Sequence, residues 1–287
     1  MIVNIRSRVN IDPVPAWRSL TEWFTPWQKI VVLTSGGVDS SLLLAAACVV
    51  APHRTTAVTA DSPSLARAEL KKVEEFVASF GVPHVHLPTD EGDNPLYQRN
   101  SGDRCYYCKT SLYSAVGAYL KNVGEGAEQV VVVDGTNQDD LQDHRPSLPA
   151  SREHGIRQPY LELRFGKELI RYLAKEQGLP MWNKPAMACL ASRIQESVVV
   201  TPEKISMVER AEEVIKAIGV STLRVRYHES GEAPFLRKIA RIEVSQEDIA
   251  FFAGHAELKA MNSALKEIGF DHVTLDLEGY SRGGRPS

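Results

Sequence analysis

Residues 29–50 constrain the fold most, because an apolar run, a glycine-containing loop and a second apolar run follow one another there. The first run, "KIVVLT", is continuous and rich in β-branched residues, which is typical of a strand buried in a parallel sheet. The second run, "SSLLLAAACVV", predicts a buried helix. The loop between them, residues 35–41, reads Ser-Gly-Gly-Val-Asp-Ser-Ser. We therefore expect a strand–loop–helix unit of the kind that builds open α/β sheets.

The alternation of strand and helix continues beyond this unit. The expected strands are 55–60, 84–87 and 129–135, and the expected helices are 64–81, 105–122 and 166–178. This order predicts an α/β fold with a doubly wound parallel sheet. Residues 1–28, which contain three spaced tryptophans, are expected to form an irregular N-terminal extension packed onto this domain.

The order of elements changes after residue 200. Thr201 is a suitable N-cap and Pro202 suits the first helical position, so a helix is expected from there to residue 219. The other expected elements are strands at 223–228, 240–244 and 272–277 and a long helix at 245–269. We therefore predict three parts: the extension 1–28, a main domain 29–200, and a smaller C-terminal α/β domain 201–287 for substrate binding or oligomerisation.

The loop after the first strand has the chemistry of an anion site. Gly36 and Gly37 allow a tight turn and a close approach of the backbone to a ligand. The serines of the loop (Ser35, Ser40, Ser41) and the first amides of the following helix offer donors at its positive end. The spacing of a Walker A loop is absent, and Asp39 would repel a phosphate that carries no cation. The loop therefore predicts a pyrophosphate group neutralised by Mg²⁺.

Charge and hydropathy limit the functions that this chain can have. The formal net charge is −3 and no long basic block is present, which argues against nucleic acid as the main partner. No apolar run is long enough to span a bilayer, and the N-terminus lacks the features of a secretory signal. We therefore expect no membrane partner and a cytoplasmic protein.

Two of the four cysteines, Cys105 and Cys108, lie three residues apart in "RCYYCK". In a reducing cytoplasm such a pair is expected to bind metal or to act in catalysis rather than to form a disulfide. A thioredoxin-like dithiol would have to follow a strand directly, which is not the setting here. Structural zinc would need a further ligand, for which His84 or His86 is available.

Five stretches together identify a family resemblance. The Ser-Gly-Gly-x-Asp-Ser loop is the signature of the PP-loop ATP pyrophosphatases, which the chain resembles. With "NSGDRCYYCKTSLY", "KPAMACLASRI", "LRVRYH…ARIEV" and "VTLDLEGYSRGG", it resembles the LarE family of sulfur transferases over almost its whole length. The resemblance implies that ATP adenylates a carboxylate of a pyridinium dicarboxylate mononucleotide. It further implies that this carboxylate becomes a thiocarboxylate on the way to a nickel-pincer nucleotide cofactor.

The resemblance also implies roles for individual residues. Cys189, in "ACLASR", would be the functional cysteine, and Arg193 would activate its thiol or hold an anion. Arg224 and Arg226 share one face of an expected strand, so they would bind the substrate phosphate beside Glu243. Two loops would complete the nucleotide site: Thr59, Ala60 and Asp61 near the adenosine, and Asn137, Asp139 and Asp140 near the phosphates and the metal.

Cys105, Cys108 and Cys189 match the set of three cysteines that some members of the family carry. Three thiolates on a [4Fe–4S] cluster leave one iron open for an extra sulfide. The alternatives are zinc and a sacrificial Cys189 that gives up its own sulfur. Sulfide or another sulfur donor would be a partner beside the pyridinium mononucleotide, and we expect a homo-oligomer such as a hexamer.

Two other functions fit part of the pattern. tRNA thiolation also joins a PP-loop to three cysteines, but this chain has neither flanking zinc-finger cysteines nor a basic domain. A nucleotide-binding regulatory protein would keep the fold without the chemistry, and would release no pyrophosphate from ATP.

Overall fold

The computed structural model describes residues 13–123, 130–141, 147–185, 188–220, 222–254 and 256–280. Some parts of the predicted features lie outside these residues: positions 1–12 of the extension, Gln129 of the strand 129–135, Ala186 and Met187 of "KPAMACLASRI", His255 of the helix 245–269, and the end of "VTLDLEGYSRGG". The chain divides into two compact units. The first comprises Met1–Asp90 and Cys105–Met187, and the second comprises Glu91–Arg104 and Ala188–Ser287.

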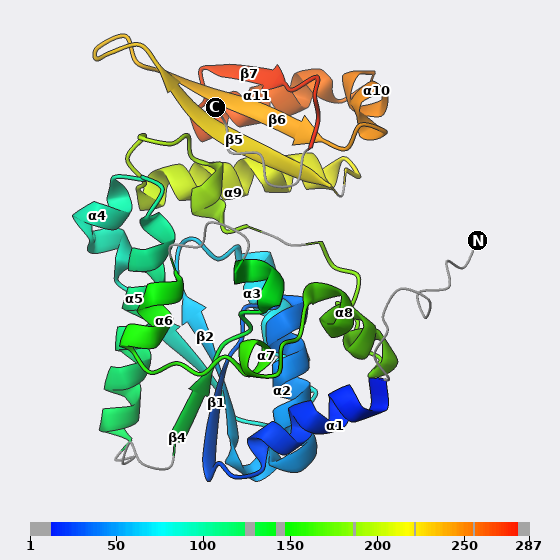
Figure 1. The fold of residues 1–287 in the computed structure, drawn as a ribbon. Coiled ribbons are helices and arrows are strands. Elements are labelled where there is room, and N and C mark those ends of the chain that lie inside the picture. Colours follow the sequence, from blue (N-terminus) through cyan, green and yellow to red (C-terminus); the bar gives the residue numbers. More distant parts are fainter. Residues whose placement is uncertain are drawn as a thin grey trace. The chain divides into compact units, whose positions relative to one another are not determined.

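A four-stranded parallel sheet forms the centre of the first unit (Figure 1). Its strands, in the order β3-β2-β1-β4, are β1 (Lys29–Leu33), β2 (Thr55–Asp61), β3 (His84–Pro88) and β4 (Val130–Val133). All neighbouring strands are parallel, so the predicted α/β fold is confirmed. Because β2 lies on one side of β1 and β4 on the other, the strand order reverses between β1 and β4. Ligands of open α/β sheets bind beyond the carboxyl ends of the strands at such a point.

Helices cover both faces of this sheet. Ile30 and Val32 of β1 point into one apolar core, and Val31 and Leu33 point into another. The first core is closed by α2 (Val38–Val50), α3 (Arg67–Ala78) and α8 (Lys167–Glu176), and the second by α5 (Arg104–Asn122) and α6 (Leu148–Glu153). Burial on both faces explains why the strand sequences are apolar throughout rather than alternating.

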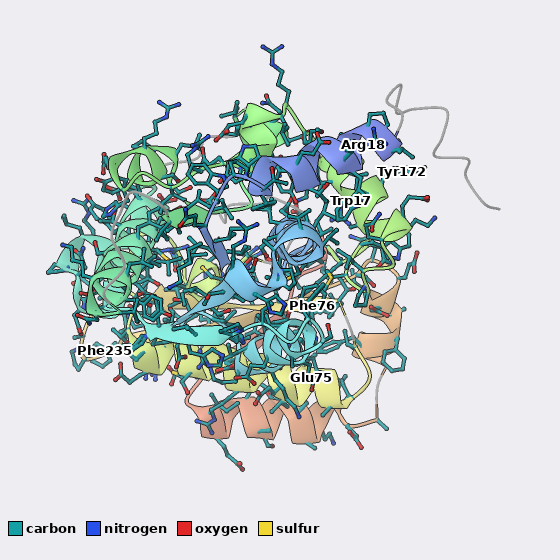
Figure 2. The ribbon with its side chains drawn as sticks, turned by 90° about the horizontal axis from the view of Figure 1, so that it is seen from below. Trp17, Arg18, Glu75, Phe76, Tyr172 and Phe235 are labelled. Carbon is teal, nitrogen blue, oxygen red and sulfur yellow. The ribbon has the colours of Figure 1, made fainter. Side chains whose placement is uncertain are left out.

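The predicted N-terminal extension is not irregular over its described part. Helix α1 (Pro13–Phe24) occupies it, because Ala16, Leu20 and Phe24 recur every four residues and bury one stripe against the first core. The helix contacts α2 and α8. Figure 2 labels Trp17 on α1 and Tyr172 on α8. Trp17, Trp23 and Trp27 are partly buried and pack against the same core.

The second unit is built on a three-stranded sheet. Strand β5 (Leu223–Ser230) pairs antiparallel with β6 (Arg237–Val244), which pairs in parallel with β7 (His272–Leu275). Helix α9 (Pro202–Ala217) packs on β5, and α11 (Leu258–Ile268) packs on α9 and β7. The N-cap of α9 is Thr201, whose side chain accepts a hydrogen bond from the Lys204 N–H at 3.3 Å.

The single helix predicted over residues 245–269 is wrong. Two helices, α10 (Asp248–Ala253) and α11, occupy this stretch, and Gly254 is the C-cap of α10. Glycine has more backbone freedom to lose in a helix than any other residue, so it favours an end at this position. Among the described residues, no helix combines the length and the apolar character needed to cross a membrane.

The second unit joins two stretches that lie apart in the chain, residues 91–104 and the segment after Met187. The side-chain amide of Asn100 donates to the carbonyls of Ile194 and Gln195 at 3.2 and 2.7 Å. The Gln195 N–H in turn donates to the carbonyl of Tyr227 on β5 at 2.9 Å. These bonds tie the segment around Asn100 and the segment after Cys189 to the C-terminal sheet, which is why both belong to the second unit.

Candidate active site

The loop between β1 and α2 folds back on the first turn of the helix. The Ser35 N–H donates to Ser40 Oγ at 3.2 Å, and that hydroxyl donates to the Gly37 carbonyl at 3.2 Å. Gly36 has a φ of +73°, and a Cβ there would lie 2.6 Å from Val73 Cγ2, so only glycine fits. Gly37 is the N-cap of α2, and no side chain caps this helix. The positive end of α2 is therefore available to an anion.

Asp39, in the first turn of α2, is held by residues from two later segments. Asn137 donates its side-chain amide to Asp39 Oδ1 at 3.1 Å, and Lys167 Nζ forms an ion pair with Asp39 Oδ2. The hydroxyl of Tyr160, in α7 (Pro159–Glu162), donates to the Asp39 carbonyl at 2.8 Å. The structure thus brings together the predicted Asp39 and Asn137. Lys167 was not predicted, and its only signal in the sequence is its position at the start of an expected helix.

Carboxylates shape the loop that follows β4. The Asn137 N–H donates to Asp140 Oδ2 at 3.0 Å, and Asp140 is buried. The Lys167 N–H donates to Asp139 Oδ2 at 2.6 Å. Asp140 therefore orients Asn137, and Asp139 orients the first turn of α8. Ser41, also predicted for the nucleotide site, is buried in α2.

Gly135 lets the end of β4 lie directly against α2. A Cβ there would lie 2.9 Å from Asp39 Cβ and 3.0 Å from the Ser40 nitrogen. Gly135→Ala is therefore expected to lower the free energy of unfolding by about 1–3 kcal/mol, because backbone must move. Gly117→Ala is the matched control. Gly117 lies in α5, where a Cβ meets nothing within 4 Å, so alanine should stabilise by about 0.5–1 kcal/mol. Urea unfolding measures both, and equal stabilities would contradict the close approach.

Thr59, Ala60 and Asp61 end strand β2. Thr59 is buried; its hydroxyl donates to the Thr34 carbonyl at 3.0 Å and lies 2.9 Å from His84 Nε2. Asp61 is partly exposed and pairs with Arg67 at 2.6 Å. The Thr59 hydroxyl is thus engaged inside the sheet, whereas Ala60 and Asp61 lie nearer the surface at the carboxyl end of the strand.

Cys105 and Cys108 lie in the first turn of α5 and share a face of the helix. Cys105 is exposed and Cys108 is half-buried. The next residue, Lys109, lies 3.8 Å through Nζ from Asp134 Oδ2, which also accepts a hydrogen bond from the Tyr113 hydroxyl at 2.6 Å. Burial by itself would raise the pKa of Asp134, but the charge of Lys109 and the hydrogen bonds outweigh it and lower that pKa. The helix that carries both cysteines is thereby fixed to the end of β4.

Cys189 belongs to the second unit, whereas Cys105 and Cys108 belong to the first. Among the residues that the structure describes, no three Asp, Glu, His or Cys side chains are arranged to hold a metal ion. Arg104, immediately before Cys105, donates to the carbonyl of Ala191, two residues after Cys189, at 3.1 Å.

Cys189 is exposed and immediately precedes the 3₁₀ turn Leu190–Arg193. Arg193 is buried, and its Nη1 donates to the carbonyls of Ala188 and Cys189, the latter at 2.9 Å. Its Nε pairs with Glu212 Oε1 at 3.0 Å. The guanidinium therefore fixes the backbone that presents Cys189.

Loss of the Arg193–Glu212 pair is expected to destabilise the second unit. Arg193→Met leaves the Glu212 carboxylate buried without a buried counter-charge, which should cost about 3–5 kcal/mol. Arg237→Met is the control, because Arg237 is 57% exposed and pairs with Asp271 at 3.6 Å, a pair worth about 1 kcal/mol or less. Urea unfolding compares the two variants. A similar small effect for both would show that the buried pair contributes no more than a surface pair.

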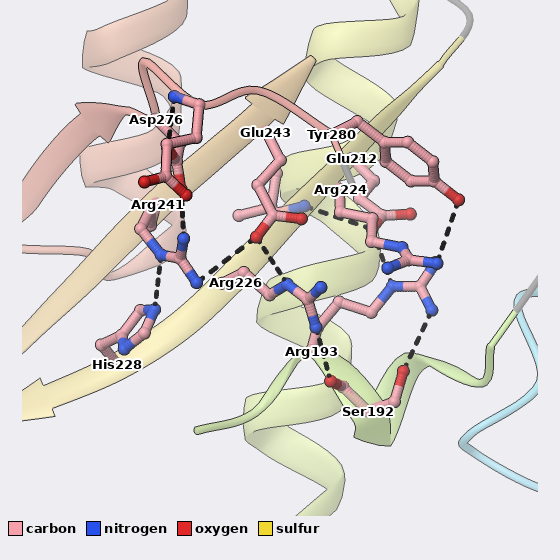
Figure 3. A network of polar contacts seen from close by, with 12 residues as sticks. Ser192, Arg193, Glu212, Arg224, Arg226, His228, Arg241, Glu243, Asp276 and Tyr280 are labelled. Carbon is pink, nitrogen blue, oxygen red and sulfur yellow. Dashed lines mark hydrogen bonds and ion pairs between the residues drawn. The ribbon is translucent and has the colours of Figure 1, made fainter. Parts of the chain in front are cut away.

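A charged network occupies one face of the sheet in the second unit (Figure 3). Arg224 lies opposite Glu243, and Arg226 lies opposite Arg241, in the antiparallel register of β5 and β6. Arg226 pairs with Glu243 Oε1 at 2.9 Å and donates to the Ser192 carbonyl at 3.0 Å. Arg241 reaches the same Glu243 oxygen at 3.3 Å. The predicted Arg224, Arg226 and Glu243 are therefore adjacent.

Arg224 is the arginine of this network that forms no ion pair with a carboxylate among the described residues. Among the described residues its partner is Tyr280, whose hydroxyl lies 3.0 Å from Nη2 and whose ring centroid lies 4.5 Å from the guanidinium carbon. Burial lowers the pKa of Arg224, and the nearby Arg193 and Arg226 lower it further. Glu243 Oε2 is buried and has no hydrogen-bond partner among the described residues. A buried cation beside a free carboxylate oxygen favours a ligand that carries both an anion and a hydroxyl.

Comparison with known proteins shows the family. The chain is 34% identical over 257 residues to the pyridinium-3,5-bisthiocarboxylic acid mononucleotide synthase of Lactiplantibacillus plantarum, covering 89% of this chain and 88% of that one. The chain belongs to the LarE family. The predicted resemblance to the LarE family is thus confirmed.

Two further relatives extend over the same length. An uncharacterized protein of Synechocystis is 36% identical over 265 residues, covering 92% of this chain and 94% of its own. An uncharacterized protein of Methanocaldococcus jannaschii is 27% identical over 253 residues, covering 88% of this chain and 91% of its own. No family model matches the chain. The LarE relationship therefore rests on whole-length similarity that includes both units.

Proposed function

We propose that this chain is an ATP-dependent sulfur transferase with the PP-loop fold. Its substrate would be pyridinium-3,5-biscarboxylic acid mononucleotide, of which it converts a carboxylate to a thiocarboxylate in the synthesis of the nickel-pincer nucleotide cofactor. The name of the Lactiplantibacillus relative supports the proposal. The buried guanidinium of Arg224 in the second unit, which has donors suited to a phosphate, supports it as well. The observation that carries the proposal is the meeting of the uncapped α2 end, Asp39 and Lys167 where the strand order reverses.

The ion pair of Asp39 and Lys167 suits a complex of ATP with Mg²⁺. In the absence of ligand the two side chains neutralise each other. When ATP binds, Asp39 is suited to hold Mg²⁺, and Lys167 is suited to hold the phosphates that leave as pyrophosphate. A substrate carboxylate oxygen attacks the α-phosphorus, and pyrophosphate leaves with the electrons of the broken bond. A sulfur nucleophile then attacks the acyl carbon, and AMP leaves.

The three cysteines suit a [4Fe–4S] cluster with one iron free of protein ligands. Cys105 and Cys189 are exposed and Cys108 is half-buried, so their thiols are accessible to metal. The bond from Arg104 to Ala191 holds the residue before Cys105 near the turn after Cys189. Bound by Cys105, Cys108 and Cys189, the cluster would supply the sulfur for transfer. Zinc and a sacrificial Cys189 are the competing outcomes.

Pyrophosphate release tests the adenylation step. With ATP, Mg²⁺ and the pyridinium mononucleotide, the protein should release pyrophosphate, and omission of the mononucleotide should reduce that release to background. Salt-dependent binding of tRNA, or no release under any condition, would favour tRNA thiolation or a regulatory role instead. Sedimentation of the purified protein tests the predicted homo-oligomer.

A further inference from the structure

Lys184 contacts the loop of residues 35–41, here called the nucleotide loop, from the side that faces α3. Its Nζ donates to the Gly36 carbonyl at 2.9 Å and pairs with Glu69 Oε2 at 2.5 Å. The side chains of Lys184 and Glu69 are only 22% and 14% exposed, so water screens the pair weakly. Burial by itself would raise the pKa of Glu69, but hydrogen bonds and charges from Lys184 and Lys72 outweigh it and lower that pKa. Glu69 is therefore a charged anchor for the Lys184 ammonium.

Hydrogen bonds also hold the backbone of Lys184 in place. Arg171 on α8 donates to the carbonyls of Trp182 and Lys184 at 2.9 and 2.7 Å. Arg171 follows Lys167 by four residues, so one face of α8 holds both Asp39 and the segment of Lys184. This segment then leads, five residues later, to Cys189.

The contact with Gly36 determines the direction of a backbone amide. The Gly36 carbonyl and the Gly37 N–H belong to one planar trans peptide, in which the two groups point in opposite directions. Lys184 holds the carbonyl on the α3 side, so the Gly37 N–H points away from α3. Among the described residues that N–H has no acceptor. A backbone donor without a partner, at the uncapped start of α2, is suited to a phosphate oxygen.

We propose that Lys184 is a positioning residue that fixes the Gly36–Gly37 peptide, so that the Gly37 N–H faces the phosphates of ATP. This inference rests on the proposed function, because it requires ATP at the loop. No direct contact between Lys184 and ATP is required.

Binding of α,β-methylene-ATP with Mg²⁺, measured by calorimetry, tests the proposal. Lys184→Met should weaken binding about tenfold, the effect of one lost hydrogen bond to a charged group. Lys184→Arg keeps a charged donor and should restore binding to within about threefold of the wild type. Lys72→Met is the matched control: Lys72 pairs with Glu69 at 2.8 Å but does not contact Gly36, so it should leave the affinity unchanged.

Two further measurements separate positioning from general stability. In protein labelled with ¹⁵N-glycine, the Gly37 amide signal should shift on addition of the analogue in the wild type and Lys72→Met, and shift little in Lys184→Met. Glu69→Gln removes the charge that anchors the Lys184 ammonium, so it should weaken binding of the analogue by about threefold to tenfold. This variant provides the test if Lys184→Met does not fold.

The results that would overturn the role of Lys184 differ from those that would overturn the proposed function. Equal affinity of Lys184→Met and the wild type would overturn the role of Lys184 alone, as would wild-type affinity in Glu69→Gln or a tenfold loss in Lys72→Met. A wild-type protein that binds neither ATP nor its analogue would instead overturn the proposed function.

Discussion

Cys189→Ala is expected to abolish thiocarboxylate formation, with a loss of about 10³-fold or more, while pyrophosphate release stays within about threefold of the wild type. The reason is that the proposed adenylation site is the loop of the first unit, whereas the exposed Cys189 belongs to the second. Separate assays of thiocarboxylate and of pyrophosphate measure the two steps. A similar loss of thiocarboxylate formation and of pyrophosphate release would contradict the assignment of the two steps to different residues.

Cys48 provides the matched control for the cysteine series. It lies in α2 against the apolar core, and burial raises the pKa of its thiol to about 12, so it is an inert thiol. Cys48→Ala should therefore leave both activities unchanged. Loss of sulfur transfer in this variant would show that any cysteine substitution disturbs the protein.

Cys105→Ala and Cys108→Ala distinguish the cluster from a sacrificial cysteine. If the three thiolates hold a cluster, each variant should lose bound iron and sulfide together with sulfur transfer. If Cys189 gives up its own sulfur, both variants should still form one product per chain. Metal analysis after anaerobic purification, combined with a product count, separates these outcomes.

Arg224→Met is expected to raise the KM for the pyridinium mononucleotide about 30- to 100-fold with little change in kcat. Arg224 is a buried guanidinium with a tyrosine as its partner and with donors left for a phosphate. Steady-state kinetics with saturating ATP measures the effect. A lowered kcat at unchanged KM would show that Arg224 acts on the chemistry and not on substrate binding.

Removal of the substrate phosphate gives an independent control for Arg224. The wild type should lose about the same factor when the mononucleotide is replaced by its nucleoside, and Arg224→Met should lose little more. Arg237→Met, on the exposed part of the same sheet, should behave as the wild type with both substrates. Additive losses in Arg224→Met would place the phosphate elsewhere.

The free energy of unfolding of the arginine variants should depend on whether the substituted residue forms a buried ion pair. Burial and two neighbouring arginines lower the pKa of Arg224, so its charge is unfavourable in the folded state, and Arg224→Met should not lower the free energy of unfolding. Arg226→Met removes the more buried of the two arginines that pair with Glu243 and leaves only Arg241 at 3.3 Å, so it should destabilise the protein by up to about 3 kcal/mol. A functional residue that costs stability is expected at a binding site.

Local patterns in the sequence predicted the elements that carry the nucleotide loop. The continuous apolar run before residue 34 predicted β1, and the loop that follows required glycine, which Gly36 confirms with its positive φ. These two predictions needed only short-range spacing and the α/β alternation. The family resemblance placed Asn137 near the phosphates, and its contact with Asp39 agrees with loops that meet at one edge of a parallel sheet.

Contacts between distant segments were beyond the reach of local patterns. Lys167 pairs with Asp39 across 128 positions, and Gly135 packs against α2 only because β4 pairs with β1. The bonds of Asn100 to residues 94 and 95 positions later moved the boundary of the second unit. In α1, the spacing of Ala16, Leu20 and Phe24 was a local signal that the tryptophans obscured.

The number of thiocarboxylates formed per chain, measured with the mass of Cys189 after the same anaerobic reaction, tests the central claim most directly. With ATP, Mg²⁺, the pyridinium mononucleotide and sulfide, the protein should form several products per chain and contain iron and sulfide, and Cys189 should keep its mass. A reaction that stops at one product per chain, in iron-free protein whose Cys189 has become dehydroalanine, would contradict the cluster as the source of sulfur.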